Sequence, residues 1–237
     1  MRDFAKPRKV NYKYYKDIVT DVDVAVEKKL ISLIHKKFPD HSILSEEIGL
    51  IERNKEYLWV IDPLDGTVNY TAGIPLFSVS ICLVRRGKPY SGVVYAPYLK
   101  EYFYGEKGKG AFLNNRKIKP STTSDLSQAV IHVAMSAHYS PELIEKNWKL
   151  LNKLSHRVRG LRMLDSGALT SCYVACGRLD GKFSIKTDPF GNAASAVIIE
   201  EAGGRVTDFK GGSWNVKMKD MLCSNQRLYK KLKGFVS

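Results

Sequence analysis

The sequence predicts an α/β protein in which helices and sheets pack as a layered sandwich. Short apolar segments between residues 77 and 113 are separated by turns of a few residues, which is typical of an antiparallel meander. After residue 130, segments with helical apolar spacing alternate with short strand-like segments. Helices that follow a meander and then alternate with strands favour layers of helix on sheet. With 237 residues, the chain is long enough to bury a sizeable core.

The first half of the chain, to about residue 128, is expected to hold one long helix and the meander. Apolar residues at 22, 26, 30, 33 and 34 repeat at helical spacing and predict a helix over about 22–38. A strand over 57–61 is expected to end in a helical turn from Gly66. The meander strands are predicted at 77–84, 90–96, 101–104 and 111–113.

The second half, about 129–237, is expected to alternate helices with strands. A helix over 141–153 begins with Pro141, a residue that suits the first helical position. The other predicted elements are a strand near 130–135, helices near 166–176 and 189–202, and strands near 181–185 and 205–207. No linker, low-complexity tract or repeat separates the halves, so we expect one compact unit over 1–237.

The segment from Trp59 to Tyr70 carries the clearest chemical signal. An apolar run ends in Asp62 and Asp65, which are followed by Gly66 and the hydroxyl of Thr67. Hard cations such as Mg²⁺ prefer oxygen ligands and share them with substrate phosphates. The pattern predicts a metal-dependent phosphoryl site, although Asp, Pro and Gly also dominate ordinary turns.

Two acidic segments upstream fit the same site. Asp17–Asp23 lies at the start of the predicted helix, where its acids could instead cap the helix and favour its first turn. Ser42–Glu47 is a short apolar segment that ends in paired glutamates, and its alternative is a solvated loop.

Together these segments resemble the inositol monophosphatase family, part of the lithium-sensitive Mg²⁺ phosphatase superfamily that includes fructose-1,6-bisphosphatases. The matching segments follow in family order: Asp17–Asp23, Ser45–Glu47, Trp59–Tyr70, Gly108–Asn114, Val174–Asp180 and Glu201–Gly204. The stretch Asp62–Thr67 is the specific one. The resemblance implies the family's α-β-α-β-α layers and a homodimer.

The resemblance also implies a ligand set for two or three Mg²⁺ ions, with Mn²⁺ possible in their place. Its members are Glu46, Asp62, Asp65 and the backbone carbonyl of Leu64. Metal ions about 4 Å apart lower the pKa of a bound water and clamp both oxygens of an in-line displacement.

The catalytic and phosphate-binding roles are implied in the same way. The Thr67 hydroxyl, with Glu46, would orient the attacking water, and Asp23 would hold Thr67. The amides of Gly66 and Thr67 would cradle the phosphate at a helix N-terminus, where backbone N–H groups favour anions.

The sequence departs from the family's pattern at its third carboxylate. Counting back from Glu201 places Gly191 where the family typically reads Trp-Asp-x-Ala-Ala. Asp188 stands three residues earlier and precedes a proline, which is an N-cap and first-turn signature. If residues 188, 191 and 192 share a helical face, Asp188 is the replacement ligand and Asn192 a weaker candidate. The alternative is that Asp188 only caps the helix.

Substrate identity is less strongly indicated. Asp165, Ser166 and Gly167 stand where the family has a Gly-Ser/Thr-Ala-Ala segment that binds substrate, and Ser184 stands where animal-type members carry a substrate-binding glutamate. Arg162 could meet a second phosphate or face solvent. The resemblance implies inositol-1-phosphate or fructose-1,6-bisphosphate, and the missing glutamate leaves room for 3′-phosphoadenosine 5′-phosphate. A catalytically impaired relative that acts by binding is the competing class, suggested by Gly191 and by the short segment before Asp23.

Composition is consistent with a phosphate-ester substrate. The net charge of +14 favours anions in general. Arg2–Lys16 mixes basic residues with tyrosines and could grip nucleic acid, but no nucleic-acid motif appears, so that partner is not expected. The four cysteines lack zinc-site spacing and are expected to be buried free thiols. No apolar stretch is long enough to span a membrane and no signal peptide is evident, so a cytoplasmic location is expected.

Overall fold

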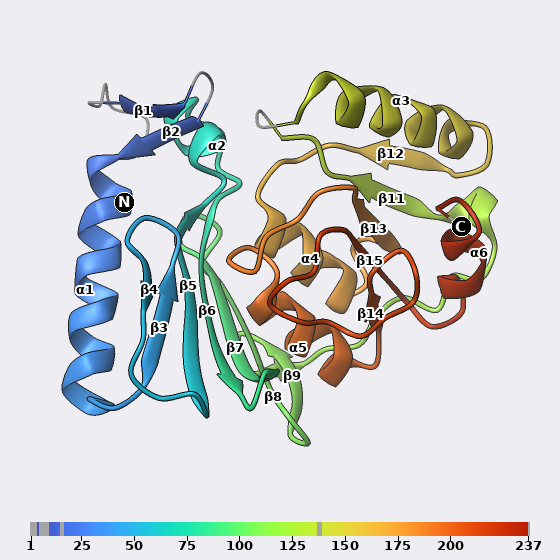
Figure 1. Cartoon of the computed structure of the whole chain (residues 1–237). Helices are drawn as coiled ribbons and strands as arrows, with labels where there is room; N and C mark the ends of the chain where they lie inside the picture. Colours follow the sequence, from blue (N-terminus) through green and yellow to red (C-terminus); the bar gives the residue numbers. More distant parts are fainter. Residues whose placement is uncertain (1–3, 5–9, 15–16, 137–138, 237) are drawn as a thin grey trace.

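Helices and sheets alternate in five layers across the molecule (Figure 1). The computed structural model describes residue 4 and residues 10–14, 17–136 and 139–236. Helix α1 (Asp21–Lys37) covers the outer face of the first sheet, α4 (Gly167–Ala175) and α5 (Ala193–Ala202) lie between the sheets, and α3 (Pro141–Ser155) and α6 (Tyr229–Lys233) cover the second sheet. This is the predicted α-β-α-β-α sandwich.

The first sheet contains the predicted antiparallel meander. Its eight strands lie in the order β10-β9-β8-β7-β6-β5-β3-β4. Their bounds are β3 (Ser42–Ser45), β4 (Gly49–Ile51), β5 (Tyr57–Asp65), β6 (Ser78–Arg85), β7 (Lys88–Ala96), β8 (Glu101–Glu106), β9 (Gly110–Leu113) and β10 (Arg116–Lys117). Strand β3 runs parallel to β5, with Ser45 opposite Ile61, so Glu46 and Asp62 lie at the same end of the sheet.

Strand β5 is longer than predicted, because its pairing with β6 does not stop at Ile61. After a register shift beyond Asp62, pairing resumes where Asp65 lies opposite Ser78. The short helix α2 (Thr67–Thr71) then follows from Gly66, as predicted. Both acids of the motif are therefore held on the end of a buried strand rather than in a free loop.

The N-terminus of α1 is fixed by a capping box. The Thr20 backbone N–H and hydroxyl donate to Asp23 at 2.9 and 2.5 Å, and the Val22 N–H donates to the Thr20 hydroxyl at 3.2 Å. Strand β2 (Asp17–Thr20) leads into the helix and pairs with β1 (Val10–Tyr14). The rest of the basic Arg2–Lys16 segment lies outside the described residues, apart from Phe4.

The second sheet is mixed and has the order β12-β11-β13-β15-β14. Its strands are β11 (Val130–Val133), β12 (Gly160–Arg162), β13 (Gly181–Ser184), β14 (Arg205–Thr207) and β15 (Met221–Ser224), and a 3₁₀ turn, η1 (Leu126–Gln128), precedes it. No prediction covered β12, β15 or α6, each of which is short. Most residues of α4 and α5 are buried, because both sheets cover these helices.

Helix α5 begins at Ala193, so the prediction that it starts at 189 is wrong. Asn192 is its N-cap residue. Asp188 instead closes a turn before the helix, since its Oδ1 accepts the Gly191 N–H at 3.1 Å. This bond is of the kind that an N-cap residue makes, but the residues it closes form a separate turn and α5 starts only after them. Residues 188, 191 and 192 therefore do not share a helical face.

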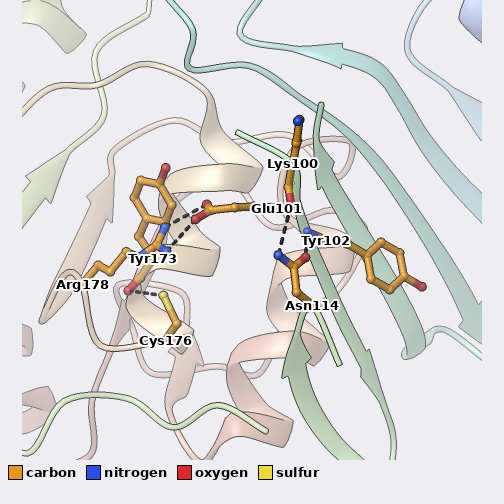
Figure 2. Close-up of polar contacts among 7 residues, drawn as sticks. All are labelled: Lys100, Glu101, Tyr102, Asn114, Tyr173, Cys176 and Arg178. Atoms are coloured by element: carbon orange, nitrogen blue, oxygen red, sulfur yellow. Dashed lines mark hydrogen bonds and ion pairs between the residues drawn. The ribbon is translucent and has the colours of Figure 1, made fainter. Parts of the chain in front are cut away.

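An ion pair ties the first sheet to the end of α4 (Figure 2). Arg178 follows α4 and donates through Nη1 and Nη2 to the two oxygens of Glu101 on β8, at 2.8 and 2.6 Å. The same guanidinium lies 4.9 Å from the ring centre of Tyr173. These contacts fix α4 between the sheets.

The four cysteines are free thiols, and three of them are buried. Within the described part of the chain, no helix is long and apolar enough to cross a membrane.

Candidate active site

A cavity of about 580 Å³ is lined by residues of both sheets and of the segments that leave them. Most of the predicted site residues line it: Glu46, Asp62, Leu64, Asp65, Gly66, Thr67, Asp165, Gly167, Ser184 and Asp188. The fold therefore brings together residues separated by more than a hundred positions in sequence.

Asp62 is the most strongly perturbed acid of the cavity. Its side chain is buried, and its Oδ1 accepts the Leu64 N–H at 3.1 Å. Burial raises the pKa of Asp62 well above its ordinary value, and the charges of Glu46, Asp65 and Asp188 and a hydrogen bond with Glu46 add to the rise. Glu46 itself is exposed. Two carboxylates that share a proton mark a place where a cation can take that proton's position.

Thr67 connects the end of β5 to α1. Its hydroxyl lies 2.9 Å from the Leu64 carbonyl and 3.3 Å from Asp23 Oδ1, and both oxygens can accept its proton. Asp23 is buried; burial raises its pKa, and hydrogen bonds from Thr20 and Thr67 oppose the rise. Asp23 therefore caps α1 and also holds Thr67. The sequence allowed two roles for this acid, capping α1 and holding Thr67, and the Asp23 side chain makes the contacts of both.

Asp65 is bonded to the start of α4. Its Oδ1 accepts the Gly167 N–H at 2.6 Å, and its Oδ2 accepts the Ser166 hydroxyl at 2.6 Å and the Ala168 N–H at 2.9 Å. Ser78 on β6 also donates to Oδ2, at 2.9 Å. A negative charge at this helix N-terminus is favoured by the unpaired N–H groups there.

The segment before α4 adopts an uncommon backbone. Asp165 and Ser166 have φ values of 58° and 44°, in the left-handed region. The family's glycine would adopt this conformation without strain, whereas Asp165 and Ser166 cost of order 1–3 kcal/mol each. The hydrogen bond from Ser166 to Asp65 helps hold them there.

Gly66 also has a positive φ, 88°, and is tightly enclosed. A Cβ at this position would lie 3.0 Å from the Leu76 carbonyl oxygen and 3.1 Å from the Ser166 Cβ. Only glycine allows β5 to turn into α2 so close to the segment before α4.

Asp188 and Gly191 lie at the side of the cavity that faces Asp62. Asp188 is solvent-accessible but crowded by protein atoms, and this desolvation raises the pKa of its carboxyl. Asn192 occupies the N-cap position of α5, and its buried side chain is bonded to Thr187 and Trp214 rather than to the helix N-terminus.

Two predicted substrate residues are placed very differently. Ser184 is buried at the end of β13 and lines the cavity. Arg162 is exposed, donates to the carbonyl of its neighbour Leu161 at 2.8 Å and is absent from the cavity wall.

Sequence reasoning missed Glu27 and Lys182. The buried Glu27 Oε1 accepts the N–H groups of Glu47 and Ile48 at 3.1 and 3.2 Å, which fixes the loop that carries Glu46. Its spacing of four residues from Asp23 on a helix could have indicated a shared face. Lys182 is buried at the cavity wall, within a predicted strand, and no sequence signal showed that it points inward.

A cavity between two sheets, with strand-end acids beside a threonine held by a buried aspartate, defines a phosphatase of the layered α/β type. Residues 1–235 match the inositol monophosphatase family. The chain belongs to this family of metal-dependent phosphatases, and it is an enzyme that acts on small phosphorylated compounds.

The chain is similar to known proteins over most of their lengths. The chain is 38% identical over 211 residues to a Thermotoga maritima protein named fructose-1,6-bisphosphatase/inositol-1-monophosphatase, which covers 89% of this chain and 79% of the relative. It is 36% identical to the Nus factor SuhB of Pasteurella multocida, over 91% of this chain and 81% of the relative. The crystal structure of the extragenic suppressor protein suhB from Bartonella henselae superposes with a TM-score of 0.92 at 33% identity, over 97% of this chain and 88% of that chain.

The residues present fit a divalent cation at one place. Glu46 and Asp62 share a hydrogen bond that such an ion would replace, and the Leu64 carbonyl lies beside them in the cavity wall. Across the described residues, no three His, Cys, Asp or Glu side chains are already arranged around a common point for an ion. One reason is that the oxygens of Asp65 are bonded to the start of α4 and to Ser78.

Proposed function

We propose that this enzyme hydrolyses inositol-1-phosphate, fructose-1,6-bisphosphate or both, with Mg²⁺ or Mn²⁺ as its cofactor. The observation that carries the proposal is that Glu46, Asp62 and the Asp23-bound Thr67 line one cavity. The name of the Thermotoga maritima relative includes both substrates.

Glu46, Asp62 and the Leu64 carbonyl are the groups that would hold the ion. When bound, it supplies positive charge that lowers the pKa of water and offsets charge on the phosphate oxygens. By sequence Asp65 is a further predicted ligand, and its oxygens are already bonded to the start of α4 and to Ser78. Asp188 remains the predicted replacement for the third carboxylate, from a turn rather than from a helix.

Thr67 and Glu46 would orient the attacking water. Because the Thr67 hydroxyl donates its proton to Leu64 or Asp23, its lone pairs are left to accept a hydrogen bond from that water. Glu46, exposed in the cavity, would take the second proton.

The substrate's phosphate would lie against the amides of Gly66 and Thr67. Its hydroxyl groups would meet Asp165, Ser166, Gly167 and Ser184, of which all but Ser166 line the cavity. Arg162 contributes only if its side chain leaves the Leu161 carbonyl. We also propose a homodimer, which light scattering of the purified chain would test.

A second candidate function is that of a catalytically impaired relative which acts by binding. It is favoured by Gly191, which replaces the family's third carboxylate, and by relatives named Nus factor SuhB. A third, hydrolysis of 3′-phosphoadenosine 5′-phosphate, is favoured by the replacement of the substrate glutamate with Ser184.

Phosphate release from a panel of these three esters separates the candidates. We expect Mg²⁺-dependent turnover that is lost in excess chelator. Thr67→Ala should lower kcat by about 10²–10⁴-fold, the range for a group that positions or transfers a proton in the transition state. Thr71→Ala removes a hydroxyl from the same helix that bonds only to the Thr67 and Val68 carbonyls, and it should leave kcat nearly unchanged. Full turnover in chelator would exclude the metal mechanism, and no turnover of any ester would favour the binding relative.

A further inference from the structure

Lys182 places a buried positive charge beside the acidic cavity. Its side chain is 2% exposed, and its Nζ donates to the Gly167 carbonyl at 2.5 Å and to the Ser171 hydroxyl at 2.9 Å. Lysine is almost never fully buried unless it is paired with negative charge. Burial lowers the pKa of Lys182, and the carboxylates of Asp65 and Asp188 oppose this. The acids of the cavity therefore favour the ammonium and offset part of the effect of its burial.

The position of Gly191 shows what the cavity lacks. A Cβ at residue 191 would lie 3.7 Å from Asp65 Oδ1 and 3.8 Å from Asp62 Oδ2. A carboxylate there would therefore stand between both acids and complete an oxygen cage of the kind that divalent cations prefer. Glycine supplies no such oxygen, and Asp188 is bonded back to the Gly191 N–H.

The negative charge of Asp65 is already met by protein groups. Its oxygens accept from Ser78, Ser166, Gly167 and Ala168. A Cβ on Gly167 would lie 3.6 Å from Asp65 Oδ1 and 3.7 Å from Lys182 Nζ, so the carboxylate and the ammonium both lie near this glycine. Donors at the start of α4 therefore surround the Asp65 carboxylate, and the buried ammonium of Lys182 lies near the same turn.

We infer that Lys182 and the first turn of α4 neutralise Asp65 in place of a second divalent cation, so that the chain holds one tightly bound ion, at Glu46, Asp62 and the Leu64 carbonyl. The inference rests on the proposed metal-dependent function. It makes Lys182 a positioning residue that sets the metal content, and it links the missing carboxylate at residue 191 to the buried lysine. A carboxylate is absent at residue 191, and a positive charge is present at residue 182.

Manganese binding to the full chain tests the inference. Equilibrium dialysis counts the Mn²⁺ ions, and electron paramagnetic resonance tells one isolated ion from two ions coupled at the short separation of a two-metal site. We expect one tight Mn²⁺ per chain with an uncoupled spectrum. The double variant Lys182→Met/Gly191→Asp removes the ammonium and restores the carboxylate, and it should bind two Mn²⁺ with a coupled spectrum.

Lys186→Met is the matched control, because Lys186 lines the same cavity but is exposed. It should keep one uncoupled ion. Two coupled ions in the unaltered chain, together with phosphatase activity, would overturn this inference and leave the proposed function standing. No Mn²⁺ binding at all would overturn both. A double variant that folds, as judged by circular dichroism, but still binds one ion would overturn the role of Lys182. If it does not fold, the ion count and spectrum of the unaltered chain decide alone.

Discussion

Single side chains of this site serve two purposes each, and Asp62 is the clearest case. In the metal-free protein, its buried carboxyl shares a hydrogen bond with Glu46 and interacts with further acids. The same oxygens are the proposed ligands. Protons and a divalent cation therefore compete for Asp62, and this competition has a measurable consequence for stability.

Stabilisation by Mg²⁺ is predicted to grow with pH. The pKa of Asp62 is raised above its ordinary 3.8, so the folded chain binds this proton more tightly than the unfolded chain. That contribution to stability is complete below 3.8 and is lost as pH rises through the higher folded pKa. In chelator, Tm should therefore be lower at a pH above the folded pKa than at one below it, and Mg²⁺ should restore more of it at the higher pH.

Thermal unfolding at both pH values, with Mg²⁺ and with chelator, measures this effect. The control is Asp62→Asn, which carries no titrating group; its Tm in chelator should depend less on pH and exceed that of the unaltered chain at the higher pH. An equal Mg²⁺ effect at both pH values would contradict the prediction.

Among the elements, α1 does the most to assemble the site. Asp23 and Glu27 lie one turn apart on the helix, and each reaches a different part of the first sheet. Asp23 meets Thr67 after β5, while Glu27 holds the loop after β3. A single helix thus sets the spacing between the water-orienting hydroxyl and Glu46.

Removal of Glu27 should weaken metal binding without touching a proposed ligand. Glu27→Ala leaves the N–H groups of Glu47 and Ile48 without their acceptor, so the loop that carries Glu46 loosens. Loss of such a supporting contact typically costs 10–100-fold in metal affinity or activity. The Mg²⁺ concentration for half-maximal activity should rise by about 10-fold or more.

Glu27→Gln is the matched control, since it keeps an oxygen acceptor, and it should shift the Mg²⁺ requirement much less. Equal shifts for the two variants would show that the charge of Glu27 matters rather than its hydrogen bonds.

At the scale of the whole molecule, the site depends on how the two sheets are held against α4 and α5. The contact between Arg178 and Glu101 is a bidentate ion pair across this junction, with the guanidinium also over Tyr173 (Figure 2). The Glu101 side chain is 15% exposed, so the pair is only partly screened by solvent.

A double-mutant cycle of Arg178→Ala and Glu101→Gln should therefore give a coupling energy near the upper end of the range for exposed pairs, about 1 kcal/mol. The comparison pair, Arg85 and Glu56, has one contact at 3.3 Å, and its glutamate is more exposed than Glu101, so it should couple more weakly. Urea unfolding of the single and double variants measures both. A weaker coupling for Arg178 and Glu101 than for Arg85 and Glu56 would show that the junction is held by apolar packing alone.

Local patterns in the sequence predicted much of the fold. Helical apolar spacing located α1 and α3 to within two residues, because these helices bury one face only. Short strands such as β12 and β15 were not predicted, because they pair with segments that are distant in sequence. The start of α5 was misplaced because a strong capping signature at Asp188 was used to close a turn instead.

The sequence by itself determined the reaction class, since Asp62–Thr67 brings oxygens and amides to the end of one strand, and neighbours in sequence are held together by covalent geometry. Only the tertiary structure decided which neighbours each of these groups contacts. It turned Asp65 toward α4, put Lys182 beside it, left Arg162 outside the cavity and set Gly191 between the acids. Charges meet across a fold according to distance in space, and a linear pattern does not specify that distance.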